Sequence, residues 1–345
     1  MKSKTVLLFL LLLCIAFVSV EKNTFKYPKY FPKPVYQFEN NQINDLKIEL
    51  GRTLFYDPIL SLDNTISCAS CHNPYNAFAH VDHNLSHGIN DKIGNRNAPV
   101  LFNLAWHKTF MWDGAINHLD VQALAPISHP DEMGESISNV LLKLNRNQIY
   151  KQLFYQAYGD SLINTERTLK SISQFLLSLI SSNSKYDSML LGKIQFNTQE
   201  QNGYRLFKLH CNSCHKEPLF STFEFKNNGL TIDTSLNDYG RYRVSLMPND
   251  SLKFKVPSLR NIEFSYPYMH DGRFKTLAQV MNHYNSIDLN NKKISTELKR
   301  NLNLSSNEKV DIIAFLRTLT DKKFLFDSKH TYPKNKYLPA KDSKY

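Results

Sequence analysis

The sequence predicts a mostly α-helical protein of two domains with long irregular loops. A chain of 345 residues with 42% hydrophobic content is long enough to build two cores. Apolar residues recur at helical intervals in several stretches, whereas the alternating pattern of strands is scarce. Long segments rich in Asn, Asp, Pro and Gly separate those stretches and are typical of loops, and loops of this length often carry function.

Apolar residues at helical spacing predict helices over residues 166–191, 199–209 and 307–319. Thr165 is the expected N-cap of the first. Loops are expected over 73–99 and 227–250. Residues 22–36, rich in Lys, Tyr, Phe and Pro, and the tail after Phe326 are expected to be irregular and to lie on the surface.

The amino terminus has the layout of a secretory signal. Lys2 and Lys4 precede an unbroken apolar run over 6–20, which is short for a membrane span. Cys14 lies inside that run among leucines and makes a poor lipoprotein cleavage site. We therefore predict a signal peptide over 1–20 and a periplasmic location, with lipidation or a membrane anchor as the alternatives.

The formal net charge is +11. Because the basic residues are dispersed along the chain, the charge argues against nucleic-acid binding. A positive surface also attracts a small acidic protein and raises the rate of encounter. The charge is therefore compatible with docking of an acidic redox partner.

Apart from Cys14, the cysteines lie in two Cys-x-x-Cys-His motifs, which comprise Cys68, Cys71 and His72 in one and Cys211, Cys214 and His215 in the other. This motif is the attachment signature of c-type haem. Two intervening residues let both thiols reach the vinyl groups of one porphyrin, and the adjoining imidazole becomes the proximal iron ligand. The sequence therefore predicts two covalently bound haem c groups.

Disulfides, zinc and a redox dithiol are the alternatives for these cysteines. Zinc would need a second thiolate pair beside each first pair, and redox dithiols usually follow a strand in a βαβ unit, which is not predicted here. Because the motifs lie far apart in the chain, each haem is assigned its own cytochrome-c-like domain. The predicted domains cover 21–190 and 191–325, followed by an irregular tail over 326–345.

The order and spacing of the motifs resemble the bacterial di-haem cytochrome c peroxidase family, including its MauG-like branch, over about residues 45–320. Besides the two haem motifs, the matching segments are 51–57, 96–99, 110–114, 122–126, 131–134, 256–261 and 266–272. In that family the amino-terminal haem reacts with peroxide, and the carboxy-terminal haem relays or stores electrons.

The resemblance assigns roles to individual residues. His72 would be the proximal ligand of the peroxide-reactive haem and His215 that of the relay haem. Glu132 matches the distal carboxylate that moves a proton between the peroxide oxygens, and Gln122 is its neighbour. Trp112 matches the aromatic residue between the haems. Taken alone, Glu132 could instead begin or cap a helix, and Trp112 could serve packing only.

The distal ligand of the second haem departs from the classical pattern. Tyr284 falls where classical members have Met, as in the MauG-like branch, and Met281 shares its face on a helix through 277–284. A phenolate favours ferric and higher oxidation states, whereas a thioether favours ferrous iron. We expect Tyr284, with Met281, Met269 and His283 as the alternatives.

Classical members also carry a distal His over the first iron, in the loop before 96–99. The loop here holds His80, His83 and His87, but an ungapped count places Ile89 at the ligand position. We therefore expect an open first haem. His87 is the alternative, because a two-residue shift in the loop would bring it to the iron.

The resemblance further implies a calcium ion between the domains. Asn97, Ser265 and Pro267 occupy the ligand positions, and hard oxygen donors suit calcium. Asn97 could instead cap a turn. Ala115 stands where Arg is common in the family, which puts one haem-propionate contact in doubt.

The resemblance implies reduction of hydrogen peroxide to water with electrons from a small cytochrome c or copper protein. One alternative is a MauG-like oxidase that removes electrons from a protein or small-molecule substrate. Another is an electron-transfer cytochrome without turnover, which would need no acid–base group such as Glu132. A homodimeric state stays open.

Overall fold

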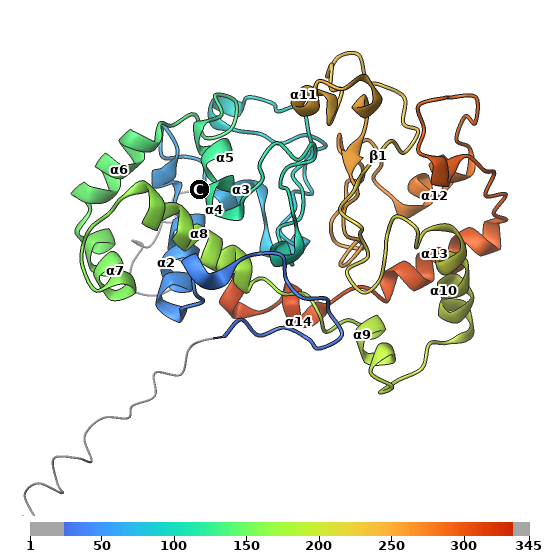
Figure 1. The fold of residues 1–345 in the computed structure, drawn as a ribbon, viewed down its shortest axis with the longest axis horizontal. Coiled ribbons are helices and arrows are strands. Elements are labelled where there is room, and N and C mark those ends of the chain that lie inside the picture. Colours follow the sequence, from blue (N-terminus) through green and yellow to red (C-terminus); the bar gives the residue numbers. More distant parts are fainter. Residues whose placement is uncertain (1–23, 334–345) are drawn as a thin grey trace, which may run out of the picture.

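The computed structural model describes residues 24–333, so the predicted signal peptide and Cys14 lie outside the described residues. Helices and loops dominate the described part (Figure 1). Its one sheet is the antiparallel pair β1 (Phe225–Lys226) and β2 (Phe254–Lys255). The prediction of a mostly α-helical chain with few strands is confirmed.

The described part of the first half contains seven α-helices, namely α2 (Asp45–Tyr56), α3 (Cys68–Cys71), α4 (Leu119–Gln122), α5 (Leu124–Ser128), α6 (Ile137–Arg146), α7 (Gln148–Tyr158) and α8 (Thr165–Ser178). The described part of the second half contains α9 (Lys185–Leu190), α10 (Thr198–His210), α11 (Tyr242–Ser245), α12 (Leu277–Asn285), α13 (Ser306–Arg317) and α14 (Lys322–Leu325). Short 3₁₀ turns lie at Phe38–Asn40, Pro58–Leu60, Pro74–Asn76, Ile89–Asp91, Leu104–Trp106, Pro248–Asp250, Thr296–Leu298 and Ser328–His330.

Two hydrophobic cores form around two closely packed helix pairs. In the first core α2 packs on α8, and in the second α10 packs on α13. A glycine lies at each crossing: a Cβ on Gly51 would stand 1.8 Å from the Ser171 carbonyl oxygen, and one on Gly203 would stand 1.9 Å from that of Asp311. Only glycine permits backbones to approach this closely. In each half the helix that carries this glycine precedes a Cys-x-x-Cys-His motif.

The predicted helices over 199–209 and 307–319 are confirmed as α10 and α13. A single helix over 166–191 is wrong, because α8 ends at Ser178 and α9 begins only at Lys185. The N-cap of α8 is Asn164 rather than Thr165, since the Asn164 side chain accepts the Arg167 N–H.

Between α8 and α9 the backbone bonds a buried carboxylate from a distant part of the chain, that of Asp321. Asp321 Oδ2 accepts hydrogen bonds from the backbone N–H groups of Ser182 and Asn183, both at 2.8 Å. These N–H groups would otherwise point along the helix axis to carbonyls one turn earlier. The Ser184 capping box then starts α9.

The expected loops over 73–99 and 227–250 are irregular apart from short turns and α11. The segment before residue 37 is also irregular, but its surface location is wrong for Phe31, which is 4% exposed and belongs to the first core. The Trp106 indole N–H anchors the segment by donating to the Pro32 carbonyl at 2.8 Å. Burial of aromatic rings outweighs the preference of a Lys-rich segment for solvent.

The buried Arg260 guanidinium ties segments of the second half together. It is 0% exposed, donates two bonds to the Asp187 carboxylate at 2.7 and 2.9 Å, and donates to the Pro218 carbonyl. Its Cζ also lies 5.0 Å from the centre of the Phe31 ring. One fully buried cation therefore joins the N-terminal segment, α9 and the turn after the second haem motif.

We expect Arg260→Gln to lower the free energy of unfolding by about 3–5 kcal/mol, because it leaves the buried Asp187 carboxylate without a counter-charge. Urea denaturation measures this loss. The control is Arg317→Gln, since Arg317 forms an exposed pair with Glu263 at 3.7 Å and should cost less than about 1 kcal/mol. Equal losses in both variants would contradict the assignment of Arg260 as a structural centre.

Candidate functional site

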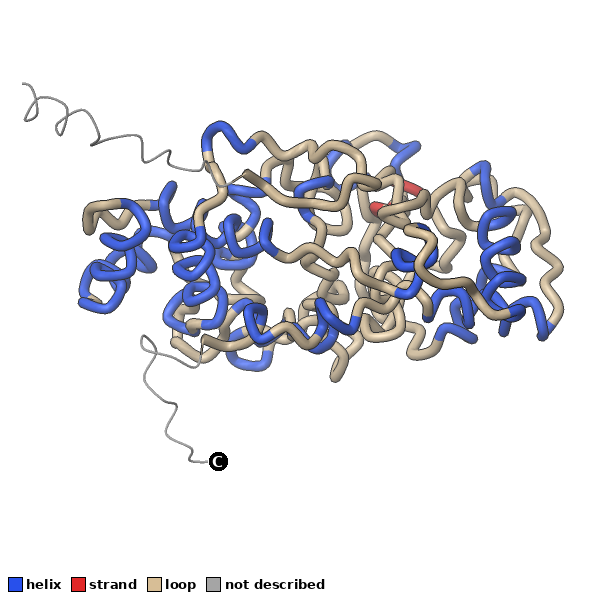
Figure 2. Tube along the Cα trace, turned by 90° about the horizontal axis from the view of Figure 1, so that it is seen from below, coloured by secondary structure: helices blue, strands red, loops and turns tan. Residues whose placement is uncertain are grey.

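The two helical ends of the molecule enclose a middle layer of loops (Figure 2). A cavity of about 480 Å³ lies in this layer and is lined by both halves of the chain. Predicted site residues in its wall are Cys68, Cys71, His72, His87, Asn97, Trp112, Gln122, Glu132, Ser265, Pro267 and Met269. The fold therefore gathers most of the predicted site around one cavity.

The first Cys-x-x-Cys-His motif forms the single turn of α3, which begins with a capping box between Ser67 and Ser70. His72 follows this turn, and its Nδ1 lies 2.7 Å from the Phe78 carbonyl oxygen. A proton on Nδ1 can only be donated to that oxygen, so Nε2 carries a free lone pair. Burial lowers the pKa of His72 to about 4. The imidazole is thus neutral and oriented, as an iron ligand must be.

The second motif repeats this arrangement. His215 Nδ1 lies 3.1 Å from the Pro257 carbonyl oxygen and 3.3 Å from that of Phe220. Burial lowers the pKa of His215 to about 4 as well. Both histidines therefore have the backbone partner that fixes the tautomer of a metal-bound imidazole.

The four cysteines in the two motifs are free thiols, so neither pair forms a disulfide. Burial raises the pKa of Cys68 to about 12 and that of Cys71 to about 11. Within residues 24–333, no group of three or more His, Cys, Asp or Glu side chains is placed to hold a metal ion. Neutral buried thiols fit thioether attachment to a haem better than a zinc site, which needs thiolates.

Glu132 lies in the turn between α5 and α6 and lines the cavity beside the first motif. Its proximity raises the pKa of both Cys68 and Cys71. Burial raises the pKa of Glu132 itself, His129 partly opposes this rise, and Asp131 adds a smaller increase. Glu132 does not cap a helix, because Ser136 is the N-cap of α6. The carboxyl group thus lies in the cavity wall close to Cys68 and Cys71.

Gln122 and Trp112 also line the cavity. The Gln122 Nε2 lies 3.7 Å from Met111 Sδ. The Trp112 indole N–H donates to the Asn97 carbonyl at 2.8 Å, and its own carbonyl accepts the Lys255 N–H at 2.8 Å. Trp112 therefore lies where a loop of the first half meets β2 of the second half.

The structure separates Tyr284 from Met281 on α12. Met281 is 4% exposed and packs in the second core. Tyr284 instead lies near Cys211 and Cys214, whose charges add to the burial that raises the pKa of its phenol to about 12. Tyr284 is therefore a neighbour of the second thiol pair, and Met281 lies in the core on which Cys211 also packs.

His283 and Met269, which could also serve as this ligand, both meet the loop residue Asn228. The His283 Nε2–H donates to the Asn228 carbonyl at 2.9 Å, and Asn228 Nδ2 lies 3.4 Å from Met269 Sδ. The Asn228 side chain also hydrogen-bonds Tyr284. Asn228 was not predicted, because nothing in its local sequence distinguishes it from other loop asparagines.

The three loop histidines lie side by side: the His83 and His87 rings stack with centres 4.1 Å apart, and the His80 ring is tilted against His83 with centres 5.2 Å apart. Of the three, His87 alone lines the cavity. Its Nδ1 lies 2.8 Å from the Asp91 carboxylate. Ile89, at the counted ligand position, is 3% exposed and does not line the cavity.

The predicted calcium ligands Asn97, Ser265 and Pro267 line the same cavity. The Asn97 amide nitrogen donates to the Asn84 carbonyl at 3.0 Å, which leaves its side-chain oxygen available. Ala115 also lines the cavity, so no side chain at that position reaches across it.

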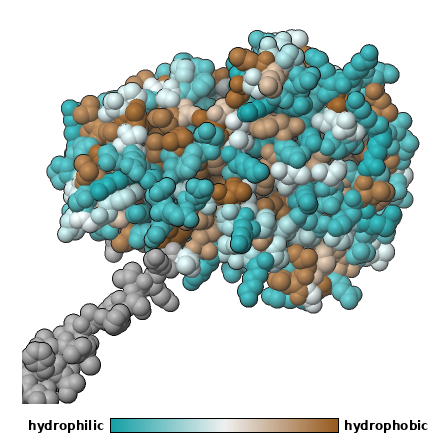
Figure 3. Space-filling model, viewed as in Figure 1, coloured by the Kyte–Doolittle hydropathy of each residue, from teal (hydrophilic) through white to brown (hydrophobic). Residues whose placement is uncertain are grey.

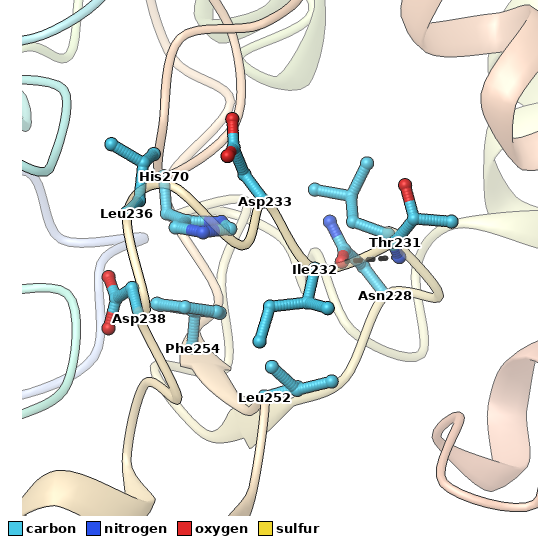
Figure 4. A pocket seen from close by; sticks show the side chains of 10 residues that line it. Asn228, Thr231, Ile232, Asp233, Leu236, Asp238, Leu252, Phe254 and His270 are labelled. Atoms are coloured by element: carbon cyan, nitrogen blue, oxygen red, sulfur yellow. Dashed lines mark hydrogen bonds between the residues drawn. The ribbon is translucent and has the colours of Figure 1, made fainter.

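A charged network not predicted in advance joins the halves beside Trp112. Arg96 bonds Asp113 at 2.7 Å and, through two nitrogens, Asp238 at 2.7 and 2.9 Å. Asp238 also borders a second, small pocket together with Phe254 and His270 (Figure 4). The His270 ring stacks on Phe254 with centres 3.6 Å apart. This pocket of about 10 Å³ holds at most one water molecule, so it is not a substrate site.

Comparison with known proteins agrees with this geometry. A family model described as di-haem cytochrome c peroxidase matches residues 45–195. The methylamine utilization protein MauG of Methylorubrum extorquens is 33% identical over 310 residues, covering 86% of this chain and 84% of MauG. This chain belongs to the di-haem cytochrome c peroxidase family. As a member of it, the chain is a di-haem oxidoreductase of the peroxidase type.

Relatives named as peroxidases and relatives named as MauG or MauG-like resemble this chain to a similar degree. Cytochrome c551 peroxidase of Nitrosomonas europaea is 34% identical over 278 residues, covering 79% of each chain. The crystal structure of a MauG-like protein associated with microbial copper homeostasis superposes with a TM-score of 0.80 at 30% identity, covering 90% of this chain and 99% of that one. The identity alone therefore does not separate a classical peroxidase from a MauG-like enzyme.

Proposed function

We propose that this protein reduces hydrogen peroxide to water with electrons from a small redox protein. The observation that carries the proposal is Glu132, a half-buried carboxyl with a raised pKa in the wall of the cavity that Cys68, Cys71 and His72 also line. A protein that only transfers electrons needs no acid–base group there. Peroxide consumption by the purified protein, with a reduced small cytochrome c or copper protein as donor, tests the proposal, and electron transfer without consumption would reject it.

Two haem c groups would be held by the two motifs, Cys68, Cys71 and His72 in a domain over 21–190 and Cys211, Cys214 and His215 in a domain over 191–325. Two separate hydrophobic cores support two domains, but the cores cross these bounds, since Tyr186 packs in the second core and Phe324 and Leu325 pack in the first. When bound, the first haem supplies an iron at which peroxide is reduced, and the second supplies a store for electrons.

Glu132 would take the proton of the peroxide oxygen nearer the iron and deliver it to the leaving oxygen, which departs as water. Two electrons from the donor and two protons complete the reduction of one peroxide to two water molecules. Burial keeps the pKa of Glu132 above that of a solvated carboxyl, which brings it closer to working pH. Gln122, in the same cavity wall, would orient the peroxide.

Trp112 would carry an electron between the halves. Its indole bonds the first half through Asn97, and its backbone bonds β2 through Lys255. This double attachment holds the ring in place at the junction. Rigid placement of an aromatic ring between two redox centres suits electron transfer without further motion.

The proximity of Tyr284 to Cys211 and Cys214 favours a second candidate function, that of a MauG-like oxidase. A tyrosine ligand on the second haem would stabilise the oxidised iron and store oxidising equivalents. Such an enzyme would remove electrons from a protein or small-molecule substrate. Peroxide-driven oxidation of a second protein, in place of consumption of donor electrons, would distinguish the two functions.

We expect Tyr284→Met to raise the reduction potential of the second haem by at least about 60 mV, a tenfold change in the one-electron equilibrium, because a thioether favours ferrous iron. Spectroelectrochemical titration measures the shift. The control is Met281→Leu, which alters core packing on the same helix and should leave the potential unchanged. The opposite pattern, a shift only in the Met281 variant, would assign the ligand to Met281.

The donor would be a small acidic cytochrome or copper protein, given the net charge of +11 and the largely hydrophilic face in Figure 3. We place the enzyme in the periplasm, where its cysteine motifs acquire haem. No helix within residues 24–333 is long and apolar enough to cross a membrane. Asn97, Ser265 and Pro267 would bind calcium across the two halves.

A further inference from the structure

Lys255 on β2 is a cation in the cavity wall with no carboxylate partner. Its ammonium donates to the Thr109 carbonyl at 2.7 Å, and no Asp or Glu within residues 24–333 forms an ion pair with it. Burial lowers its pKa to about 7, against a smaller opposing effect of Asp113. The cavity cation Arg96, in contrast, is paired with both Asp113 and Asp238.

His107 is a second unsatisfied group in the same wall. Its Nδ1 is buried without a hydrogen-bond partner, and its ring packs on Phe223 with centres 4.1 Å apart. The charge of Lys255 contributes to lowering its pKa, so the two side chains are neighbours. Two adjacent nitrogen donors thus face one cavity without an anion.

A half-buried cation without a carboxylate partner and a buried nitrogen without a hydrogen-bond partner both carry a free-energy penalty. A carboxylate between them would remove both penalties, because it accepts several hydrogen bonds and carries the opposite charge. The haem proposed for this cavity brings propionate carboxylates. Ala115, in the same wall, brings no charged or polar side chain to this part of the cavity. Arg243 also reaches the cavity, but its side chain is exposed to solvent.

We propose that Lys255 and His107 together bind a haem propionate. The inference rests on haem attachment in the proposed function, but not on peroxide turnover. Lys255 is then a positioning residue, which holds the haem through its propionate. Binding of a propionate would also give the Lys255 ammonium of β2 a counter-charge in a largely apolar cavity wall.

Resonance Raman spectroscopy of the ferric holoprotein tests this pairing, because the propionate-bending band reports hydrogen bonding to the carboxylate. We expect the band to shift in Lys255→Met and in His107→Leu and to return toward its original position in Lys255→Arg. Lys253→Met is the matched control, since Lys253 lies two residues away and pairs with Asp250 at 3.1 Å. If the methionine variant does not fold, Lys255→Gln gives the same readout.

An unshifted band in Lys255→Met or Lys255→Gln would overturn the proposal. A shift of equal size in Lys253→Met would do so too, since it would show a general effect of charge. A free carboxylate could occupy the site instead. In that case the wild-type spectrum would change with added acetate, whereas a propionate predicts no acetate dependence. Because the readout needs only attached haem, it is independent of whether the protein consumes peroxide.

Discussion

Replacing Glu132 by glutamine is expected to slow the reaction with peroxide by about 10²–10⁴-fold, the usual contribution of a positioned acid–base group. Glutamine keeps the size of the side chain but cannot take or give a proton at working pH. Haem attachment should be unchanged, because Glu132 is not part of either Cys-x-x-Cys-His motif. Stopped-flow mixing of the ferric protein with peroxide measures the rate.

The control is Asp131→Asn, which removes the adjacent carboxylate. Asp131 pairs with Lys92 at 3.4 Å and does not line the cavity, so its loss should leave the rate within a few fold. A pH profile adds a second readout. Only ionised Glu132 can accept the first proton, so the wild-type rate should fall as pH drops through its raised pKa. The Gln variant should show no such step, and a similar profile in both proteins would exclude Glu132 as the base.

Removing both thiols of the second motif, Cys211→Ala with Cys214→Ala, is expected to halve the covalent haem content and abolish donor-driven turnover. Without its thioether bonds the second haem has no covalent hold, and the first haem has no route to the donor. The alkaline pyridine spectrum gives the haem content, and donor oxidation gives the turnover. Reaction of the first haem with a single equivalent of peroxide should survive, because its cavity lies around the other motif.

Ser213→Ala is the matched control for the second motif, since it changes a residue between the two cysteines and keeps both thiols. It should retain two haems and full turnover. If the double variant still binds two haems covalently, the assignment of the second motif is wrong. If it turns over the donor at the wild-type rate with one haem, the relay role is wrong.

Helices with local signals were predictable from the sequence. The helix α10 begins with an Asn197 and Glu200 capping box and ends in the second haem motif, and all of these signals lie within a few residues of each other. The break between α8 and α9 had no such signal. Asp321, which takes the N–H groups of Ser182 and Asn183, lies far along the chain. Only the tertiary fold brings this carboxylate to the helix end.

The same distinction applies to the site. The haem motifs were predictable because the two cysteines and the histidine of each motif lie within five consecutive residues. Glu132 and Trp112 were found only through resemblance to a family. Lys255, His107 and Asn228 were missed altogether. Each is an ordinary residue in its local sequence and gains a role only because distant loops meet around one cavity. Contacts of this kind need the fold before they can be recognised.

Electron paramagnetic resonance of the purified ferric protein, followed by addition of peroxide, tests the central claim most directly. We expect two haems, a high-spin signal from an open first haem at rest, and rapid reaction with peroxide without prior reduction. Two low-spin signals, from haems that react with peroxide only after one-electron reduction, would contradict the open site. They would instead support His87 as the distal ligand of the first haem. Inertness to peroxide in every oxidation state would contradict the peroxidase itself.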